Sequence, residues 1–122
     1  MARHRWHILR DGASVTVARH LPVRLDLAVE GCLSLPASRP VSRTRVAQQI
    51  RQDMWRALQN LRGFSPVVRV VQDGAILRVT AGGRLATKAG AGNAEAKIAA
   101  LLERPEMQAR WLAHAARRAA HG

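Results

Sequence analysis

The sequence predicts an α+β fold in which a single antiparallel sheet carries helices packed on one face. Apolar residues alternate around two Asp-Gly dipeptides, one further segment has a period of two, and the remaining apolar stripes repeat at helical spacing. In chain order these patterns give ββ-β-α-ββ-α-α. The 122 residues, 48% of them apolar, suit a single domain over 1–122.

The first expected element is a hairpin over residues 5–18. Its Asp11-Gly12 dipeptide favours a type I′ turn. A two-residue turn there would place Ile8 opposite Val15 and Trp6 opposite Val17. The next strand is expected at residues 23–30, where the larger apolar residues recur at every second position: Val23, Leu25, Leu27 and Val29.

A connector over residues 31–42, with Pro36 and Pro40, leads to the first expected helix. Ser42 or Thr44 can cap this helix, which is expected at about 43–62. Its apolar residues share one stripe: Val46, Ile50, Met54, Ala57, Leu58 and Leu61.

A second hairpin is expected from residues 66–72 and 75–81 around Asp73-Gly74. A flexible glycine-rich loop is expected over 82–93, without the residue order of a phosphate-binding P-loop. Asn93 can cap a helix that ends near Glu103, and a C-terminal basic helix is expected at about 106–120.

The charge of the chain is strongly one-sided. Lysine and arginine total 20 against 8 acids, a formal net charge of +12. Only Lys88 and Lys97 are lysines, so the other cations are arginines, whose planar donors suit phosphates. A polyanion, above all nucleic acid, is the first partner to consider. A GC-rich genome would also favour arginine over lysine, but it would not explain why acids are scarce.

Three groups of residues are candidate nucleic-acid contacts. On the first helix, Trp55 is expected among Arg51, Gln48, Gln59 and Arg62, an indole on a basic face that suits base stacking unless another element covers it. In the second hairpin, a two-residue turn would set Arg69 directly opposite Arg78. Opposed like charges need an anion between them, either a phosphate or a carboxylate such as Asp26 or Glu30.

The third group lies on the C-terminal helix, where helical spacing places basic residues on one side: Arg110, His114, Arg117, Arg118 and His121. This stripe can track a phosphate backbone. Cations near a helix C-terminus are also favoured by the helix dipole, so the pattern has an explanation without a ligand.

The segment Glu30-Gly31-Cys32-Leu33-Ser34-Leu35-Pro36 resembles the EGCLS motif of peptide deformylases, in which the cysteine is a metal ligand. The resemblance covers seven residues, and the chain lacks the HExxH helix that would supply the other ligands. Cys32 is therefore expected to be a small buried apolar residue. No catalytic residues, no metal and no cofactor are expected.

The sequence thus favours a small non-catalytic protein that binds nucleic acid, with RNA or single strands slightly favoured over duplex DNA. No helix-turn-helix, zinc-finger or RRM signature is present. The alternative is an adaptor or inhibitor that docks an acidic protein partner through the same arginine and tryptophan surface. The single cysteine and the absence of a long apolar run favour the cytoplasm.

Overall fold

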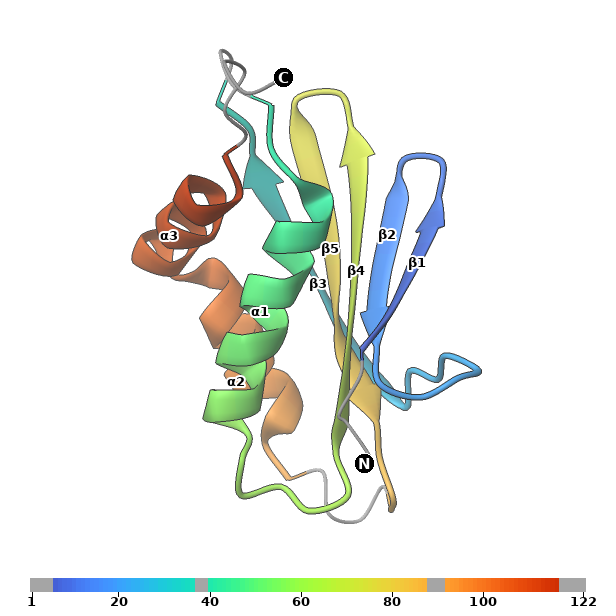
Figure 1. Ribbon diagram of the computed structural model, residues 1–122. Coiled ribbons are helices and arrows are strands. Elements are labelled where there is room, and N and C mark those ends of the chain that lie inside the picture. Colours follow the sequence, from blue (N-terminus) through green and yellow to red (C-terminus); the bar gives the residue numbers. More distant parts are fainter. Residues whose placement is uncertain (1–5, 37–39, 88–91, 117–122) are drawn as a thin grey trace.

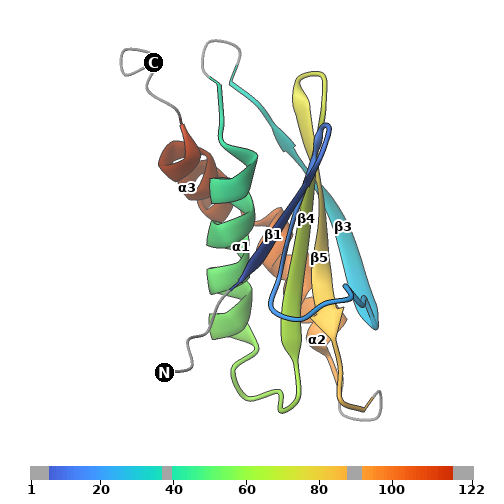
Figure 2. The same ribbon diagram turned by 45° about the vertical axis from the view of Figure 1, so that its right-hand side comes forward.

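A computed structural model describes residues 6–36, 40–87 and 92–116. The elements follow the order β1 (His7–Asp11), β2 (Ser14–Ala18), β3 (Leu27–Ser34), α1 (Arg43–Ala57), β4 (Ser65–Asp73), β5 (Ile76–Arg84), α2 (Ala94–Glu103) and α3 (Pro105–Ala115). The five strands form one antiparallel sheet in the order β1-β2-β4-β5-β3. The helices lie against one face of this sheet (Figures 1 and 2). The predicted fold class is confirmed.

The core lies between α1 and the middle of the sheet. Val46, Ile50 and Met54 of α1 are fully buried, as the apolar stripe predicted. They pack in one cluster with alternate residues of the strands, among them Val68 and Val70 of β4. Helix α3 adds the fully buried Trp111 to the same cluster.

Both hairpins turn one residue later than expected. The two-residue turns are Gly12-Ala13 and Gly74-Ala75, so Asp11 pairs with Ser14 and Asp73 with Ile76. Gly12 and Gly74 have φ near +60°, and no other residue type has a positive φ in the described chain. A glycine at the first turn position is the pattern of a type II′ turn, which replaces the expected type I′.

The register follows from these turns. Ile8 pairs with Val17 instead of Val15. In the second hairpin Arg69 pairs with Thr80, and Arg78 pairs with Val71. The expectation that the two arginines directly oppose each other is wrong. They share the uncovered face of the sheet as diagonal neighbours.

Strand β3 lies four residues later than the period-two pattern suggested. Residues 23–26 precede the strand, which instead continues through Gly31 and Cys32 to Ser34. The sequence pattern predicts that Gly31 begins a connector, which is wrong. In the structure, a Cβ at Gly31 would lie 3.3 Å from Leu102 of α2, so the glycine lets this helix approach the sheet.

Strand β5 likewise extends to Arg84, into the region expected to be a glycine-rich loop. A Cβ at Gly82 would lie 2.0 Å from the Leu27 carbonyl oxygen, and one at Gly83 would lie 2.3 Å from the Ser65 carbonyl oxygen. The absence of a side chain at these two glycines therefore lets the backbones of β3 and β4 approach β5 closely.

Helix α2 spans Ala94–Glu103 as predicted, whereas α1 and α3 are shorter than expected. Helix α1 ends at Ala57 instead of near Arg62, and Gly63 follows with a φ of +73°. Ser42 is its N-cap, and its hydroxyl accepts a hydrogen bond from the backbone N–H of Arg45. Helix α3 ends at Ala115, and residues 117–122 lie outside the described chain.

Candidate nucleic-acid interface

Trp55 is the predicted site residue that the structure places most clearly at the surface. Its side chain is 52% exposed near the end of α1, and the alternative that another element covers it is wrong. It borders a groove of about 620 Å³ at the end of the sheet where β4 begins and β5 ends. The groove is lined by Trp6, Arg19, His20, Arg24, Trp55, Gly63, Phe64, Ser65, Pro66, Arg84, Leu85 and Ala86. We call this the aromatic-arginine groove.

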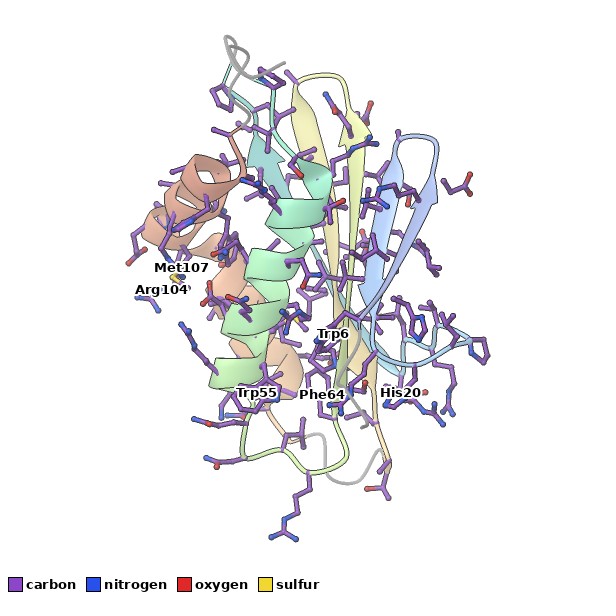
Figure 3. All side chains as sticks on the ribbon, in the orientation of Figure 1. Trp6, His20, Trp55, Phe64, Arg104 and Met107 are labelled. Atoms are coloured by element: carbon purple, nitrogen blue, oxygen red, sulfur yellow. The ribbon has the colours of Figure 1, made fainter. Side chains whose placement is uncertain are left out.

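Aromatic rings are concentrated in this groove. The chain has three tryptophans and one phenylalanine, and every one of them except Trp111 lines it. Figure 3 shows Trp6, Trp55 and Phe64 close to the end of α1, with His20 on the side of the loop between β2 and β3. The aromatic wall therefore comes from three segments far apart in sequence.

The basic wall is built from other segments. Arg19 follows β2, Arg24 precedes β3, and Arg84 is the last residue of β5. Arg24, 51% exposed, pairs at 3.1 Å with Asp26, which is 16% exposed and also accepts a hydrogen bond from the backbone N–H of Leu85 at 2.8 Å. The exposed side of the Arg24 guanidinium remains open to a phosphate. No acidic residue is among the described residues that line the groove.

Arg51 contacts the groove residue Trp6 without lining the groove itself. Its guanidinium carbon lies 4.3 Å from the centroid of the Trp6 ring, a cation–π contact. Its Nε donates a 2.8 Å hydrogen bond to Oε1 of Gln48, and partial burial lowers its pKa. Arg51 was predicted to lie beside Trp55, but the ring it contacts is that of Trp6. Arg62 is exposed next to Gly63, at the edge of the groove.

Arg69 and Arg78 lie outside the groove, on the uncovered sheet face. Nε of Arg69 donates to the Thr16 hydroxyl at 3.3 Å. Nε of Arg78 donates to Asp73 at 3.0 Å, and this hydrogen bond is the main reason that the pKa of Arg78 is raised. The reason for expecting a phosphate between the two arginines was their direct opposition, which the register removes.

Arg110 forms an ion pair with the buried Asp53, although its own side chain stays 39% exposed. The Asp53 side chain is 6% exposed, and the same carboxylate oxygen accepts a 2.6 Å hydrogen bond from the indole N–H of Trp111. Arg110 thus ties α3 to α1, while Arg117 and Arg118 lie outside the described residues. Of the expected C-terminal stripe, only Arg110 and the exposed His114 lie within the described residues, and His121 lies outside them together with Arg117 and Arg118.

A second hollow, of about 860 Å³, lies at the opposite end of α1. Its basic residues are Arg10, Arg43 and Arg45. Arg10 donates to the Thr44 hydroxyl at 3.4 Å, and Arg43 donates to the Gly12 carbonyl oxygen at 3.1 Å. It has no aromatic ring among its described lining residues. We call it the α1 N-terminal hollow.

Sequence reasoning missed most of the aromatic-arginine groove. The sequence patterns place Trp6 in the first hairpin and Arg84 in the glycine-rich loop, and they assign no role to Phe64. A usable signal was that Phe64 directly follows Gly63 at a helix end, because turn residues between elements often reach the surface. The convergence of Trp6, His20 and Arg84 on Trp55 depends on the sheet order, which the sequence did not predict.

Cys32 is exposed on the uncovered sheet face, so the expectation that it is buried is wrong. Because β3 extends through Cys32 to Ser34, side chains alternate between the two faces along this segment, and Cys32 lies on the face away from the helices. Within the described ranges, no three His, Cys, Asp or Glu side chains gather as metal ligands would. In the same part of the chain, every helix is too short or too polar to cross a membrane.

No protein-family model, curated protein or solved structure matches this chain.

Proposed function

We propose that this protein binds single-stranded nucleic acid through the aromatic-arginine groove, with RNA favoured over DNA and without catalysis. One observation supports this most strongly: the groove combines Trp6, Trp55 and Phe64 with three arginines and no acidic lining residue in the described chain. Unpaired bases stack on aromatic rings, while arginines hold the phosphates between them. A cytoplasmic location, where single-stranded RNA is available, is part of this proposal.

Duplex DNA fits the described surface less well. A duplex is usually read by a helix or a two-stranded ribbon inserted into the major groove. Here Trp55 and the other rings border a concave surface instead, where only an unstacked base can lie against them. Single strands are therefore favoured over duplexes.

A protein partner is the alternative because Trp55 is 52% exposed and Leu21, next to the groove residue His20, is 49% exposed. Exposed tryptophan is enriched in the hot spots of protein interfaces. Affinity for a nucleic acid should fall more than tenfold between about 50 and 200 mM salt when about three phosphates are bound. A partner held mainly by Trp55 should lose far less.

The test is fluorescence anisotropy of labelled 12-nucleotide oligo-U, oligo-dT and a 12-base-pair duplex at about 50 mM salt. We expect the single strands to bind in a range of about 1 to 100 µM and to bind more tightly than the duplex. Loss of one base stack in Trp55→Ala should weaken binding about 5- to 100-fold. The matched control is Trp55→Phe, which keeps an aromatic ring and should lose less.

Arg104→Ala controls for loss of charge alone. Arg104 lies at the α2–α3 junction, away from the groove, and pairs with Glu106 at 3.3 Å (Figure 3). This variant should bind as the unaltered protein does. Absence of binding to every strand at about 50 mM salt would refute the proposed function.

A further inference from the structure

We infer that the aromatic-arginine groove holds a segment of only two or three nucleotides, with bases on the aromatic wall and phosphates on the basic wall. This inference rests on the proposed function and specifies its ligand. It predicts a short binding footprint in place of a long track across the arginine-rich surface.

The composition of the two walls sets the size of the segment. Trp55 is exposed, whereas Trp6 and Phe64 are partly buried against the core and Arg51 lies over the Trp6 ring, so the three rings set an upper limit of three stacked bases. Arg19, Arg24 and Arg84 line the same groove and set a matching upper limit of three phosphate contacts. The volume of about 620 Å³ falls within the range of small-molecule sites, roughly 300 to 1,000 Å³. A groove of this size does not accommodate a long strand.

The two walls also orient the ligand. The rings belong to the chain before β1, to α1 and to the turn before β4, whereas Arg19 and Arg24 belong to the loop between β2 and β3. Figure 3 shows His20 of this loop across from Trp55, with Trp6 and Phe64 between them. A nucleotide with its base toward α1 would therefore direct its phosphates toward the loop and Arg84.

Arg51 makes the aromatic wall more rigid. It packs on the Trp6 ring and is itself fixed by Gln48. A ring that is already held loses less conformational freedom when a base stacks on it. The short ligand can therefore gain affinity from the groove without contacts elsewhere.

Other arginines of the described chain are engaged away from the groove. Arg78 pairs with Asp73, Arg104 with Glu106, and Arg110 with Asp53. The α1 N-terminal hollow lies at the other end of a 15-residue helix, about 22 Å away. Three stacked nucleotides, at about 3.4 Å each, do not span that distance.

The experiment is a calorimetric length series of 5′-phosphorylated oligo-U with one, two, three, four, six and twelve nucleotides. Affinity should rise with length up to three nucleotides. For longer strands, the affinity divided by the number of positions at which the groove can bind the strand (the affinity per register) should stay constant. Since each phosphate contributes about −0.7 for single strands, three phosphates should give a slope of log affinity against log salt of about −2. Arg84→Ala should lower both the trinucleotide affinity and this slope, and Arg104→Ala should change neither.

Three results would overturn the short footprint. The first is an affinity per register that keeps rising beyond four nucleotides, with a slope steeper than about −4. The second is that Arg43→Ala/Arg45→Ala weakens trinucleotide binding as much as Arg84→Ala does. The third is that uridine monophosphate binds as tightly as the trinucleotide, which would make the groove a site for free nucleotides.

The outcomes also separate this inference from the proposed function. Binding of the 12-nucleotide strand without measurable trinucleotide binding would refute the short footprint alone. Failure of every length, including twelve nucleotides, would refute the proposed function as well. Unfolding midpoints of Trp55→Ala and Arg84→Ala, measured alongside, identify any loss that comes from unfolding.

Discussion

Replacing Asp53 by alanine should destabilise the fold more than any other loss of an acidic side chain in the described chain. Asp53 is 6% exposed and accepts hydrogen bonds from Trp111 and Arg110, and its second oxygen lies 3.8 Å from Arg56. It is the carboxylate that joins α1 to α3. Removing it leaves the fully buried indole N–H of Trp111 without a partner.

The magnitude follows from these contacts. A buried donor that loses its partner costs about 1 to 3 kcal/mol, and a hydrogen bond to a charged group contributes about 1.5 to 3 kcal/mol. Breaking a buried ion pair costs about 3 to 5 kcal/mol, but Arg110 is 39% exposed and can be hydrated again, which reduces this cost. We expect Asp53→Ala to cost about 3 kcal/mol.

Urea unfolding, followed by circular dichroism, measures this loss as a lower midpoint with an unchanged m value. The thermal midpoint should fall by on the order of 10 °C. Asp53→Asn keeps an oxygen acceptor for Trp111 and should lose less. Asp73→Ala is the matched control, because Asp73 is 60% exposed and pairs only at the surface with Arg78. A loss below about 1 kcal/mol in Asp53→Ala would refute this account of the α1–α3 contact.

Three further predictions concern other parts of the fold. Gly82→Ala should cost about 1 to 3 kcal/mol in urea unfolding, because its Cβ would meet the Leu27 carbonyl oxygen; wild-type stability in this variant would contradict the close approach. The pKa of Glu106 in the folded protein is lowered mainly by a hydrogen bond to its own backbone. The ionised Glu106 therefore stabilises the fold at pH values above the pKa of the unfolded chain, and this contribution is lost as the pH falls through the lower pKa of the folded protein. Glu106→Gln should therefore reduce the loss of stability below about pH 4.5 in acid titrations, and an unchanged titration would contradict this. Arg69→Ala/Arg78→Ala should leave the trinucleotide affinity in calorimetry unchanged, since neither arginine lines the groove, and a clear loss would extend the footprint onto the sheet.

Patterns local in the sequence predicted the elements well. The stripe through Val46, Ile50 and Met54 identified α1, and the Asp-Gly dipeptides identified both hairpins. What local patterns could not supply was the position of each turn. Asp-Gly suits a type I′ turn, but in each hairpin the following alanine enters the turn and the glycine takes its first position.

The strand ends near Gly31, Gly82 and Gly83 were predicted wrongly, because the role of these glycines depends on contacts that are distant in the sequence. Gly31, Gly82 and Gly83 were treated as breakers, whereas each lies within a strand that another segment approaches closely. The approaching atoms belong to Leu102, Leu27 and Ser65, which are distant in sequence. Whether a glycine ends a strand or permits contact depends on those partners, so a single local window does not decide it.

The positions of the acidic residues determine which arginines have an acidic partner. Four of the eight acids pair with arginines in the described chain: Asp26, Asp53, Asp73 and Glu106. Asp53, Asp73 and Glu106 lie away from the groove, whereas Asp26 lies beside it and pairs with Arg24, whose own side chain is 51% exposed. Arg84 lines the same groove as the three aromatic rings, and no acidic residue is among the described residues that line it. The net charge of +12 favours a polyanion in bulk, and the aromatic-arginine groove is the concave surface where arginines and rings meet with no acid among the described lining residues.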